Sequence, residues 1–389
     1  MSFLSFVIEY KFVILFYVLI IAIVVVNKKK FDFQAKFIAL YRTQVGIKLM
    51  HKFSDWLGGF IRGFGYVGIF IGYAGMVLIL YFILEGFYKL IFVPEAPATL
   101  APVIPGVPIP GSPIFVPFWY GITALFVVVA VHEFCHGIVS AAHNIKVKNS
   151  GIVFFGPLIG AFVEPDEKEL KKKSWWAQES LFAAGPVANG VLSVVVMLLL
   201  LFLLFPMMSS FVTPTGFFFE DVTEDYPALA AGVQPKTVYS TINNVPVNNA
   251  SYLNELLNNI KPGDPVVIGN ENLTHTVITT EHPDKPEKAF LGIIGLQSKH
   301  ALKDSAQQWK FDVLTVISKF LQWVFILSLG IGLANLLPLG PVDGGRMLHL
   351  TLKKWFGEKR AMVVFSKITV LLLALIIILV IVPIFKAVI

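Results

Sequence analysis

The sequence has little cysteine and little charge, and each shortage restricts the class of protein. Its single cysteine, Cys135, excludes an intramolecular disulfide framework and any cysteine-rich zinc module. A metal bound by this chain must therefore take histidine and carboxylate ligands. Charged residues make up only 14% of the chain and hydrophobic residues 56%, which is too apolar for a soluble globular protein of this length. We expect the chain to lie in a lipid bilayer.

Internal repeats and nucleic-acid-binding motifs are also missing from the sequence. The formal net charge is +6, but the basic residues cluster beside apolar segments, where they act as topology determinants. We therefore expect no nucleic-acid partner. The lack of a repeat between the two halves argues against a transporter, which broken membrane helices would otherwise suggest.

The apolar residues come in unbroken blocks rather than at the period of a soluble helix or strand. A stretch of about 20 apolar residues crosses the hydrocarbon core of a bilayer. The sequence predicts about six such spans, near residues 4–26, 66–93, 116–141, 176–205, 313–338 and 362–386. Lys28, Lys29 and Lys30 follow the first block as an anchor, so we expect it to be retained and not cleaved as a signal peptide.

The loops between these spans are alternately rich and poor in lysine and arginine. They are abundant in segments 27–65, 142–174 and 344–360, whereas segment 94–115 has none and segment 206–312 is net acidic. Because Lys and Arg are enriched in cytoplasmic loops, we expect the first three segments on the cytoplasmic side. The other two segments and both termini are then expected on the outer face of a multi-pass cell-membrane protein.

Two segments differ in composition from the spans. The 94–115 loop is rich in proline and is expected to be an extended surface segment. Segment 206–312 has alternating apolar strands, turn pairs and one helical stretch near Tyr252–Ile260, which predicts a small independent domain. We accordingly expect four parts. Residues 1–115 form N-terminal helices with an outer loop, residues 116–209 the first half of the membrane core, residues 210–296 an inserted domain, and residues 297–389 the second half of the core.

The run from His132 to His136 carries the chemistry of the third predicted span. His132 and His136 are four residues apart, so both imidazoles lie on one face of a helix, a spacing that suits two ligands of one zinc ion. Glu133 is adjacent in sequence and can reach a water molecule as a general base. The alternative is a polar patch at a helix end. However, histidine and glutamate side chains inside a membrane are energetically unfavourable unless they form a functional site or pair with each other.

Catalytic zinc needs a third protein ligand, and Asp343 is the best candidate. It ends a run that starts at Asn335, in which Pro338 and Pro341 break the fifth span near its cytoplasmic end. The third and fifth predicted spans run in the same direction, so both motifs are expected at one depth. His143, about two turns after His136, is a rival ligand. Cys135 points away from the two histidines and is expected to be a small buried residue.

Three motifs occur in the order found in the site-2 protease family, which this sequence resembles over roughly residues 116–350. They are His132-Glu133-Phe134-Cys135-His136, Gly185-Pro186-Val187-Ala188-Asn189, and the run from Asn335 to Gly345. The resemblance implies one Zn²⁺ per chain, bound by His132, His136 and Asp343, with Glu133 as the base. It also implies that Asn335 helps to hold the substrate carbonyl or oxyanion, although its amide could equally satisfy backbone groups freed by Pro338.

The resemblance extends to two further segments. The segment matching residues 150–162 forms a membrane-embedded strand hairpin in the family, and such a hairpin could pair with an extended substrate. Residues 210–296 resemble a PDZ domain of the protease-associated type, except that Lys236 replaces the expected glycine after Pro235. Asn189, at the start of the fourth span, is interpreted as a residue that ties helices together.

The expected fold class is an α-helical polytopic membrane protein with a small α+β PDZ-like extramembrane domain. The resemblance implies an intramembrane zinc metalloprotease that cleaves transmembrane-helix protein substrates near the cytoplasmic side, with a peptide ligand for the outer PDZ-like domain. One alternative is another membrane zincin whose third ligand is a downstream glutamate, such as Glu164 or Glu179. The other is a catalytically silent membrane scaffold.

Overall fold

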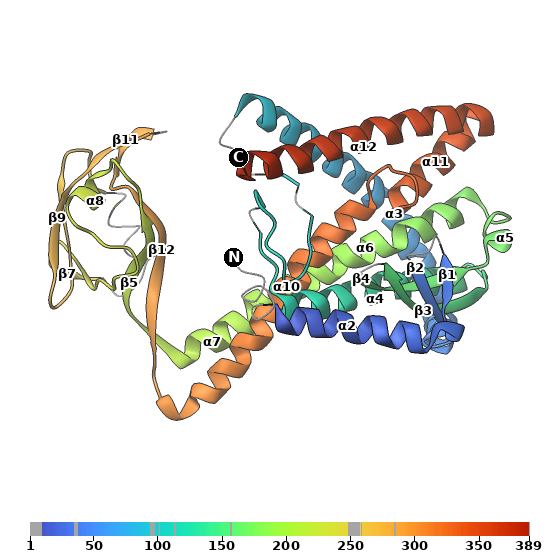
Figure 1. Ribbon diagram of the computed structural model, residues 1–389, viewed down its shortest axis with the longest axis horizontal. Coiled ribbons are helices and arrows are strands. Elements are labelled where there is room, and N and C mark those ends of the chain that lie inside the picture. Colours follow the sequence, from blue (N-terminus) through green and yellow to red (C-terminus); the bar gives the residue numbers. More distant parts are fainter. Residues whose placement is uncertain are drawn as a thin grey trace. The chain divides into compact units, whose positions relative to one another are not determined.

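The apolar blocks of the sequence form long helices in the computed structural model (Figure 1). The structure describes residues 10–34, 38–93, 98–100, 102–112, 114–155, 158–247, 257, 259–283 and 285–388. The chain divides into two compact units, one formed by residues 1–200 and 317–389 and the other by residues 201–316. The helices that lie wholly in the first unit are α2 (Lys11–Val26), α3 (Ile47–Phe92), α4 (Phe118–Ala142), α5 (Glu167–Leu170), α6 (Trp175–Leu199), α11 (Asp343–Phe356) and α12 (Glu358–Val388), with the short η1 (Lys28–Lys30).

Five helical segments of the described chain are long and apolar enough to cross a membrane. These candidate spans are Ile47–Phe92, Phe118–Ala142, Trp175–Phe211, Ser305–Asn335 and Glu358–Ala387. The third continues from α6 through the π-helical η2 (Leu200–Leu204) into α7 (Phe205–Phe211), and the fourth comprises η3 (Ser305–Gln307) and α10 (Gln308–Asn335). The helical membrane architecture expected from the sequence is therefore present, with five of the six predicted spans.

The second predicted span differs from the structure in length, and the first is only partly within the described residues. The described part of the first is α2, an apolar helix of 16 residues, which is shorter than the usual span of about 20 residues. The second was expected to begin at residue 66, but α3 begins at Ile47 and has 46 residues. Its first turns carry Lys48, Lys52 and Asp55, so they are helical without being apolar, and hydropathy alone does not reveal them.

A four-stranded antiparallel sheet packs beside α4 in the first unit. Its strands are β1 (Asp32–Gln34), β2 (Ile38–Thr43), β3 (Val147–Phe155) and β4 (Leu158–Pro165), in that order across the sheet. The hairpin β3–β4 is the one implied by the family resemblance. Strands β1 and β2 were not predicted, since they are short and β2 pairs along its whole length with β3, from Ile38↔Phe155 to Thr43↔Ser150.

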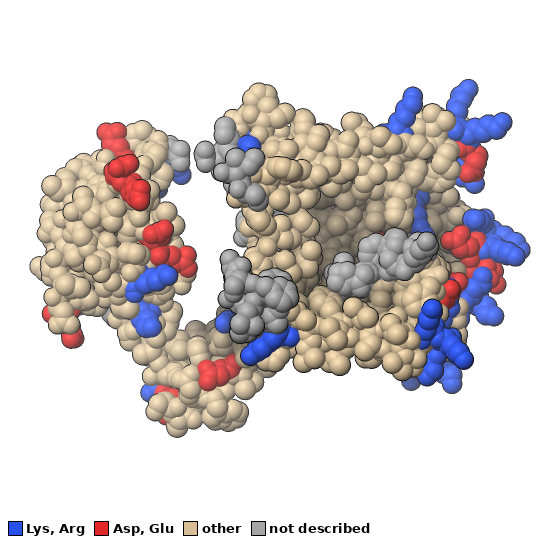
Figure 2. Space-filling view, in the orientation of Figure 1, with Lys and Arg blue, Asp and Glu red and all other residues tan. Residues whose placement is uncertain are grey.

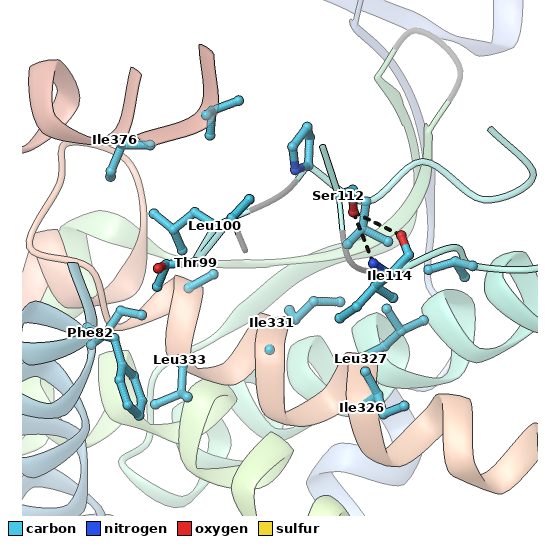
Figure 3. A pocket seen from close by; sticks show the side chains of 18 of the residues that line it. Phe82, Thr99, Leu100, Ser112, Ile114, Ile326, Leu327, Ile331, Leu333 and Ile376 are labelled. Atoms are coloured by element: carbon cyan, nitrogen blue, oxygen red, sulfur yellow. Dashed lines mark hydrogen bonds between the residues drawn. The ribbon is translucent and has the colours of Figure 1, made fainter. Parts of the chain in front are cut away.

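The proline-rich segment does not lie entirely on the surface. Its described residues form no helix or strand, as expected, but Pro105 and Gly106 are buried. Together with α3, α10 and α12 this segment surrounds a cavity of about 660 Å³ (Figure 3). The described residues that line the cavity include no titratable side chain. The expectation of an extended surface segment therefore applies to most of its described residues but not to all of them, because proline content fixes backbone shape and not burial.

Basic side chains gather at one end of the first unit. In Figure 2, lysine and arginine cover the end where the four-stranded sheet, α5 and the junction of α11 with α12 lie. The segments that contribute there are η1, residues 171–173 after α5, and residues 353–360. The three loops that the charge pattern grouped on one side therefore do meet at one end of the helices.

The second unit is built around strands. They are β5 (Val212–Val222), β6 (Thr241–Ile242), β7 (Val245–Pro246), β8 (Pro265–Gly269), β9 (Thr274–Ile278), β10 (Thr280–His282), β11 (Lys285–Phe290) and β12 (Ile293–Leu302), with the short helix α8 (Pro227–Ala230). Strand β12 pairs antiparallel with β5, and β7-β6-β8-β9 form a second sheet. Phe217, Phe219 and Tyr239 are fully buried in the core, so the Gly216–Phe219 run is a buried strand.

The backbone at Lys236 is relevant to the resemblance of this unit to a PDZ domain. Lys236 has φ +61°, in the left-handed region that glycine adopts most easily. The residue therefore takes the conformation expected of the glycine it replaces, and its amide donates to the Phe219 carbonyl at 2.7 Å. The helical stretch expected near Tyr252–Ile260 lies largely outside the described residues.

Candidate metal centre

Helix α4 brings two histidines to one point in the core of the first unit. His132 and His136 are buried, with exposed fractions of 5% and 8%, and their Nε2 atoms are 3.2 Å apart. This closeness follows from the four-residue spacing, which places both imidazoles on one helix face. The two imidazoles thus lie on one helix face and close together, as the spacing predicts.

Asp343 approaches the same point from a different part of the chain. Helix α10 ends at Asn335, and α11 begins at Asp343 after a break that contains Pro338 and Pro341. At Gly345 a Cβ would lie 1.7 Å from the Leu339 carbonyl oxygen, so only glycine permits this tight turn. The break places the carboxylate of Asp343 against the two imidazoles.

The three side chains are spaced as ligands of one tetrahedral ion. Asp343 Oδ2 is 3.0 Å from His132 Nε2 and 3.3 Å from His136 Nε2. Zinc bonds to nitrogen and oxygen are about 2.0–2.2 Å long, which gives a tetrahedron with edges of roughly 3.3–3.6 Å. The observed separations are at or slightly below this range. Two imidazoles and one carboxylate, with a fourth position for water, are a usual ligand set of catalytic zinc.

Gly185 provides the space beside these ligands. A Cβ at this position would lie 2.4 Å from both His132 Nε2 and His136 Nε2. Any larger residue would therefore occupy the place where the ligand atoms converge. The Gly-Pro-x-x-Asn motif was interpreted from the sequence as a helix-packing motif, and the structure shows that its glycine also borders the candidate metal centre.

Hydrogen bonds at the outer ring nitrogens orient both imidazoles. His136 Nδ1 donates to the Leu181 carbonyl at 2.7 Å, which leaves Nε2 free to bind a metal. His132 Nδ1 lies 3.1 Å from the Asn189 side-chain amide, and Asn189 is completely buried. Rotation of that amide brings its oxygen, which has no other partner among the described residues, to accept the Nδ1 proton of a metal-bound His132.

The interpretation of Asn189 as only a tie between helices was therefore incomplete. Its backbone carbonyl does accept from Ser193 and Ser328, which links helices as expected. Its side chain, however, contacts a candidate ligand. The sequence placed Asn189 on the next helix but did not show which way that helix turns its polar residue.

Glu133 and Asn335 border the cavity that contains the three ligands. This cavity has a volume of about 330 Å³ and is also lined by Phe162, Val163 and Arg346. Glu133 Oε2 accepts a hydrogen bond of 2.9 Å from the backbone amide of Val163 in β4. The base candidate is thus held beside the ligands by the edge strand of the sheet.

The other candidate ligands lie elsewhere. His143 Nε2 forms a 2.9 Å hydrogen bond with Ser180 Oγ, and Glu164 interacts with Arg42 and Asn149. Cys135 lines a different, apolar cavity with Phe60 and Phe64. Among the described residues, the group of metal-ligating side chains is His132, His136 and Asp343.

The first unit combines long apolar helices with a helix that carries two candidate histidine ligands, and a distant aspartate completes this candidate ligand set. These features are typical of polytopic membrane metallopeptidases. The model of Peptidase family M50 matches residues 120–379, more than half of the chain. The chain therefore belongs to this family, the site-2 protease family of zinc metalloproteases.

A relative of the chain is found in an archaeon. An uncharacterized protein of Methanocaldococcus jannaschii is 28% identical over 235 residues, which are 59% of this chain and 56% of that protein. The chain thus spans little more than half the length of this relative. This similarity does not assign an activity to the chain, because the relative is itself uncharacterized.

Proposed function

We propose that this protein is an intramembrane zinc metalloprotease that hydrolyses peptide bonds within or near the transmembrane helices of membrane-anchored substrates. The observation that carries the proposal is the convergence of His132, His136 and Asp343 beside Glu133 in one cavity. This group contains both a possible metal-binding set and a candidate base. Membership of Peptidase family M50 adds support.

The roles of the side chains follow from their chemistry. When bound, zinc supplies a Lewis acid that polarises a carbonyl and activates water. Glu133 accepts the proton of the attacking water and then delivers it to the leaving amine. The side chain of Asn335 lines the same cavity and can donate a hydrogen bond to the developing oxyanion.

Strand β4 is suited to present an extended substrate to this site. It lies at the edge of its sheet, and the amide of Val163 points away from β3 toward Glu133. Alternate residues of an antiparallel strand turn their backbone groups the same way, so Ala161 also offers its amide and carbonyl at this edge. Peptide bonds in a helix are shielded from attack, so the substrate must be locally unwound. The unwound segment can then pair with this edge of β4.

The proposal assigns the two units different tasks. The second unit, as a PDZ-like domain on the outer face, binds a peptide and screens substrates that have already been trimmed outside the membrane. The gathering of lysine and arginine at the sheet end of the first unit (Figure 2) supports a cytoplasmic position for that end, by the charge preference of short loops. The active site then lies near the cytoplasmic side.

The test is cleavage of a single-span substrate in liposomes containing the full-length protein. Wild type is compared with Glu133→Gln and with Glu167→Gln as a matched control, because Glu167 is exposed and forms a surface ion pair with Lys171. We expect cleavage within the span, reduced roughly 10²- to 10⁴-fold in Glu133→Gln and unchanged in Glu167→Gln. Cleavage that persists in Glu133→Gln would rule out the assigned base.

A further inference from the structure

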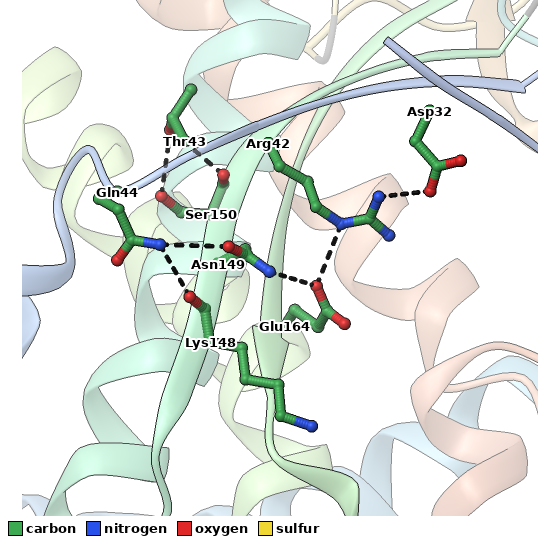
Figure 4. Close-up of polar contacts among 8 residues, drawn as sticks. All are labelled: Asp32, Arg42, Thr43, Gln44, Lys148, Asn149, Ser150 and Glu164. Atoms are coloured by element: carbon green, nitrogen blue, oxygen red, sulfur yellow. Dashed lines mark hydrogen bonds and ion pairs between the residues drawn. The ribbon is translucent and has the colours of Figure 1, made fainter. Parts of the chain in front are cut away.

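A polar network crosses the four-stranded sheet next to the candidate site (Figure 4). Arg42 of β2 contacts two carboxylates, Asp32 of β1 and Glu164 of β4. Its Nε lies 3.3 Å from Glu164 Oε2, and the same oxygen accepts from Asn149 Nδ2 of β3 at 3.0 Å. All four strands of the sheet are thus connected through Arg42 and its partners.

The network lies where the backbone ladder of the sheet is irregular. The pairing of β3 with β4 shifts register between Val147 and Asn149, and the extra residue of such a bulge lacks a ladder partner. Here that residue is Lys148, and its carbonyl accepts from Gln44 Nε2 at 2.9 Å. Gln44 also donates to Asn149 Oδ1 at 3.1 Å. Side chains therefore replace the missing ladder contacts at the end of β4.

The residue before Glu164 is the one that holds Glu133. Val163 pairs with Ser150 of β3 and donates its amide to Glu133 Oε2 at 2.9 Å. Ser150 is in turn held by its hydroxyl, which donates to the Val45 carbonyl at 2.6 Å. A displacement of the end of β4 would therefore move the amide that orients Glu133.

We infer that Arg42, acting through Glu164 and Asn149, is a positioning residue that fixes the end of β4 and thereby the orientation of Glu133. The inference rests on the proposed function only in that Glu133 is taken as the base. Arg42 lies outside residues 120–379, which match the family, so this is a contribution of the N-terminal part of the chain.

The exposure of the pair decides what Arg42 contributes. The side chains of Arg42 and Glu164 are 34% and 40% exposed, and exposed ion pairs add little to stability. Hydrogen bonds from Asn149 and then from Arg42 hold the pKa of Glu164 below its ordinary value, so the carboxylate stays ionised near neutral pH. Loss of Arg42 should thus change the local position of β4 much more than the stability of the protein.

The residue type is also specific. Arginine presents several N–H groups in a planar fork, and here different nitrogens reach Asp32 and Glu164. Lysine has a single charged nitrogen and cannot span two separate carboxylates in the same way. Arg42→Lys should therefore restore the charge without restoring the position of β4.

The experiment measures amide hydrogen exchange of residues 159–165 in the full-length protein, together with kcat and KM for the single-span substrate. The variants are Arg42→Ala, Arg42→Lys, Glu164→Ala, the double alanine variant, and Lys148→Ala. The last is a control for charge alone, because Lys148 pairs with Asp166 at 3.1 Å and its charge also lowers the pKa of Glu164, whereas within the described residues it forms no hydrogen bond or ion pair with Glu164.

We expect Arg42→Ala to raise exchange in β4 and lower kcat, each about tenfold, with the zinc content and melting temperature unchanged. The Arg42 and Glu164 effects should not add, because the two residues act as one unit. Wild-type exchange and kcat in Arg42→Ala, or an equal effect in Lys148→Ala, would overturn the inference. If the wild type cleaves nothing, the proposed function fails, and exchange of β4 alone then decides the positioning role.

Discussion

Two buried polar clusters lie in the helical core, and they differ in the chemistry of their contacts. In the first, His132, His136 and Asp343 turn ring nitrogens and a carboxylate oxygen toward one another at 3.0–3.3 Å. In the second, Glu179 Oε1 accepts from the hydroxyl of Thr351 at 3.0 Å and from that of Tyr73 at 3.4 Å. The first cluster connects α4 with α11, and the second connects α6 with α11 and α3.

The difference teaches how a metal site is told from a structural polar cluster. Hydroxyl protons satisfy Glu179 Oε1, as is usual for a buried polar atom, whereas Oε2 has no hydrogen-bond partner among the described residues. In the histidine cluster, lone pairs of three groups converge, and each imidazole is anchored at its other nitrogen. A cation satisfies such an arrangement better than the few available protons do. Burial and polarity are shared by the two clusters and therefore do not distinguish them. The types of hydrogen-bond donor and acceptor do.

The largest expected effect comes from filling the space beside the histidines. Gly185→Ala would place a methyl group 2.4 Å from both ligand nitrogens, so it should abolish zinc binding and cleavage. Gly190→Ala is the matched control, because a Cβ there meets no atom within 4 Å. Metal analysis and the cleavage assay check the pair. Full zinc in Gly185→Ala would mean that the ligands converge elsewhere.

Asn335→Ala separates catalysis from metal binding. Asn335 lines the cavity but is not one of the three candidate ligands, so zinc content should stay at the wild-type value. Loss of an oxyanion donor lowers kcat by roughly 10²- to 10³-fold. A wild-type kcat together with a lower melting temperature would instead assign Asn335 to the backbone groups freed by Pro338.

Asn189→Ala tests the orientation of His132. The side chain that contacts His132 Nδ1 is lost, and removal of such an outer partner weakens metal binding roughly 10- to 100-fold. Competition with a zinc chelator gives the affinity. Asn189→Asp is the informative companion, because it keeps an acceptor for the Nδ1 proton and should retain tighter binding than Asn189→Ala. Equal affinity in wild type and Asn189→Ala would leave Asn189 with its helix-linking role alone.

The smallest expected effect is that of Glu179→Gln. The amide keeps an acceptor for Thr351, so stability should fall only by about 1 kcal/mol, read as a lower melting temperature. Zinc content and kcat should stay at the wild-type values. A loss of zinc in this variant would support the alternative membrane zincin, in which a glutamate is the third ligand.

The convergence of the three candidate ligands could be predicted because it follows from simple rules of helix geometry. Helical periodicity fixes the faces of His132 and His136, and the parallel course of two spans brings Asp343 to their depth. The contacts of Gly185 and Asn189 could not be predicted, since they depend on the rotation of α6 about its axis. Helix α6 is apolar on most sides, so its sequence has no periodic pattern from which that rotation could be predicted.

The fold could be predicted to a similar extent. Apolar blocks located five helices, but the amphipathic start of α3 and the short strands β1 and β2 carry no comparable signal. These strands of 3 and 6 residues are stable through pairing: β1 pairs with β2, and β2 pairs with β3, which lies more than a hundred residues away in the chain. Arg42 therefore looked like a loop charge in the sequence, whereas in the structure it joins β2 to the edge strand β4.

The most direct test of the account is the zinc content of the purified full-length protein, measured for wild type, His136→Ala, Asp343→Ala and Glu179→Ala. The account predicts about one zinc per chain in wild type and Glu179→Ala, and a strong reduction in His136→Ala and Asp343→Ala. A wild type without zinc, or zinc that is retained in Asp343→Ala and lost in Glu179→Ala, would contradict the metal centre described above.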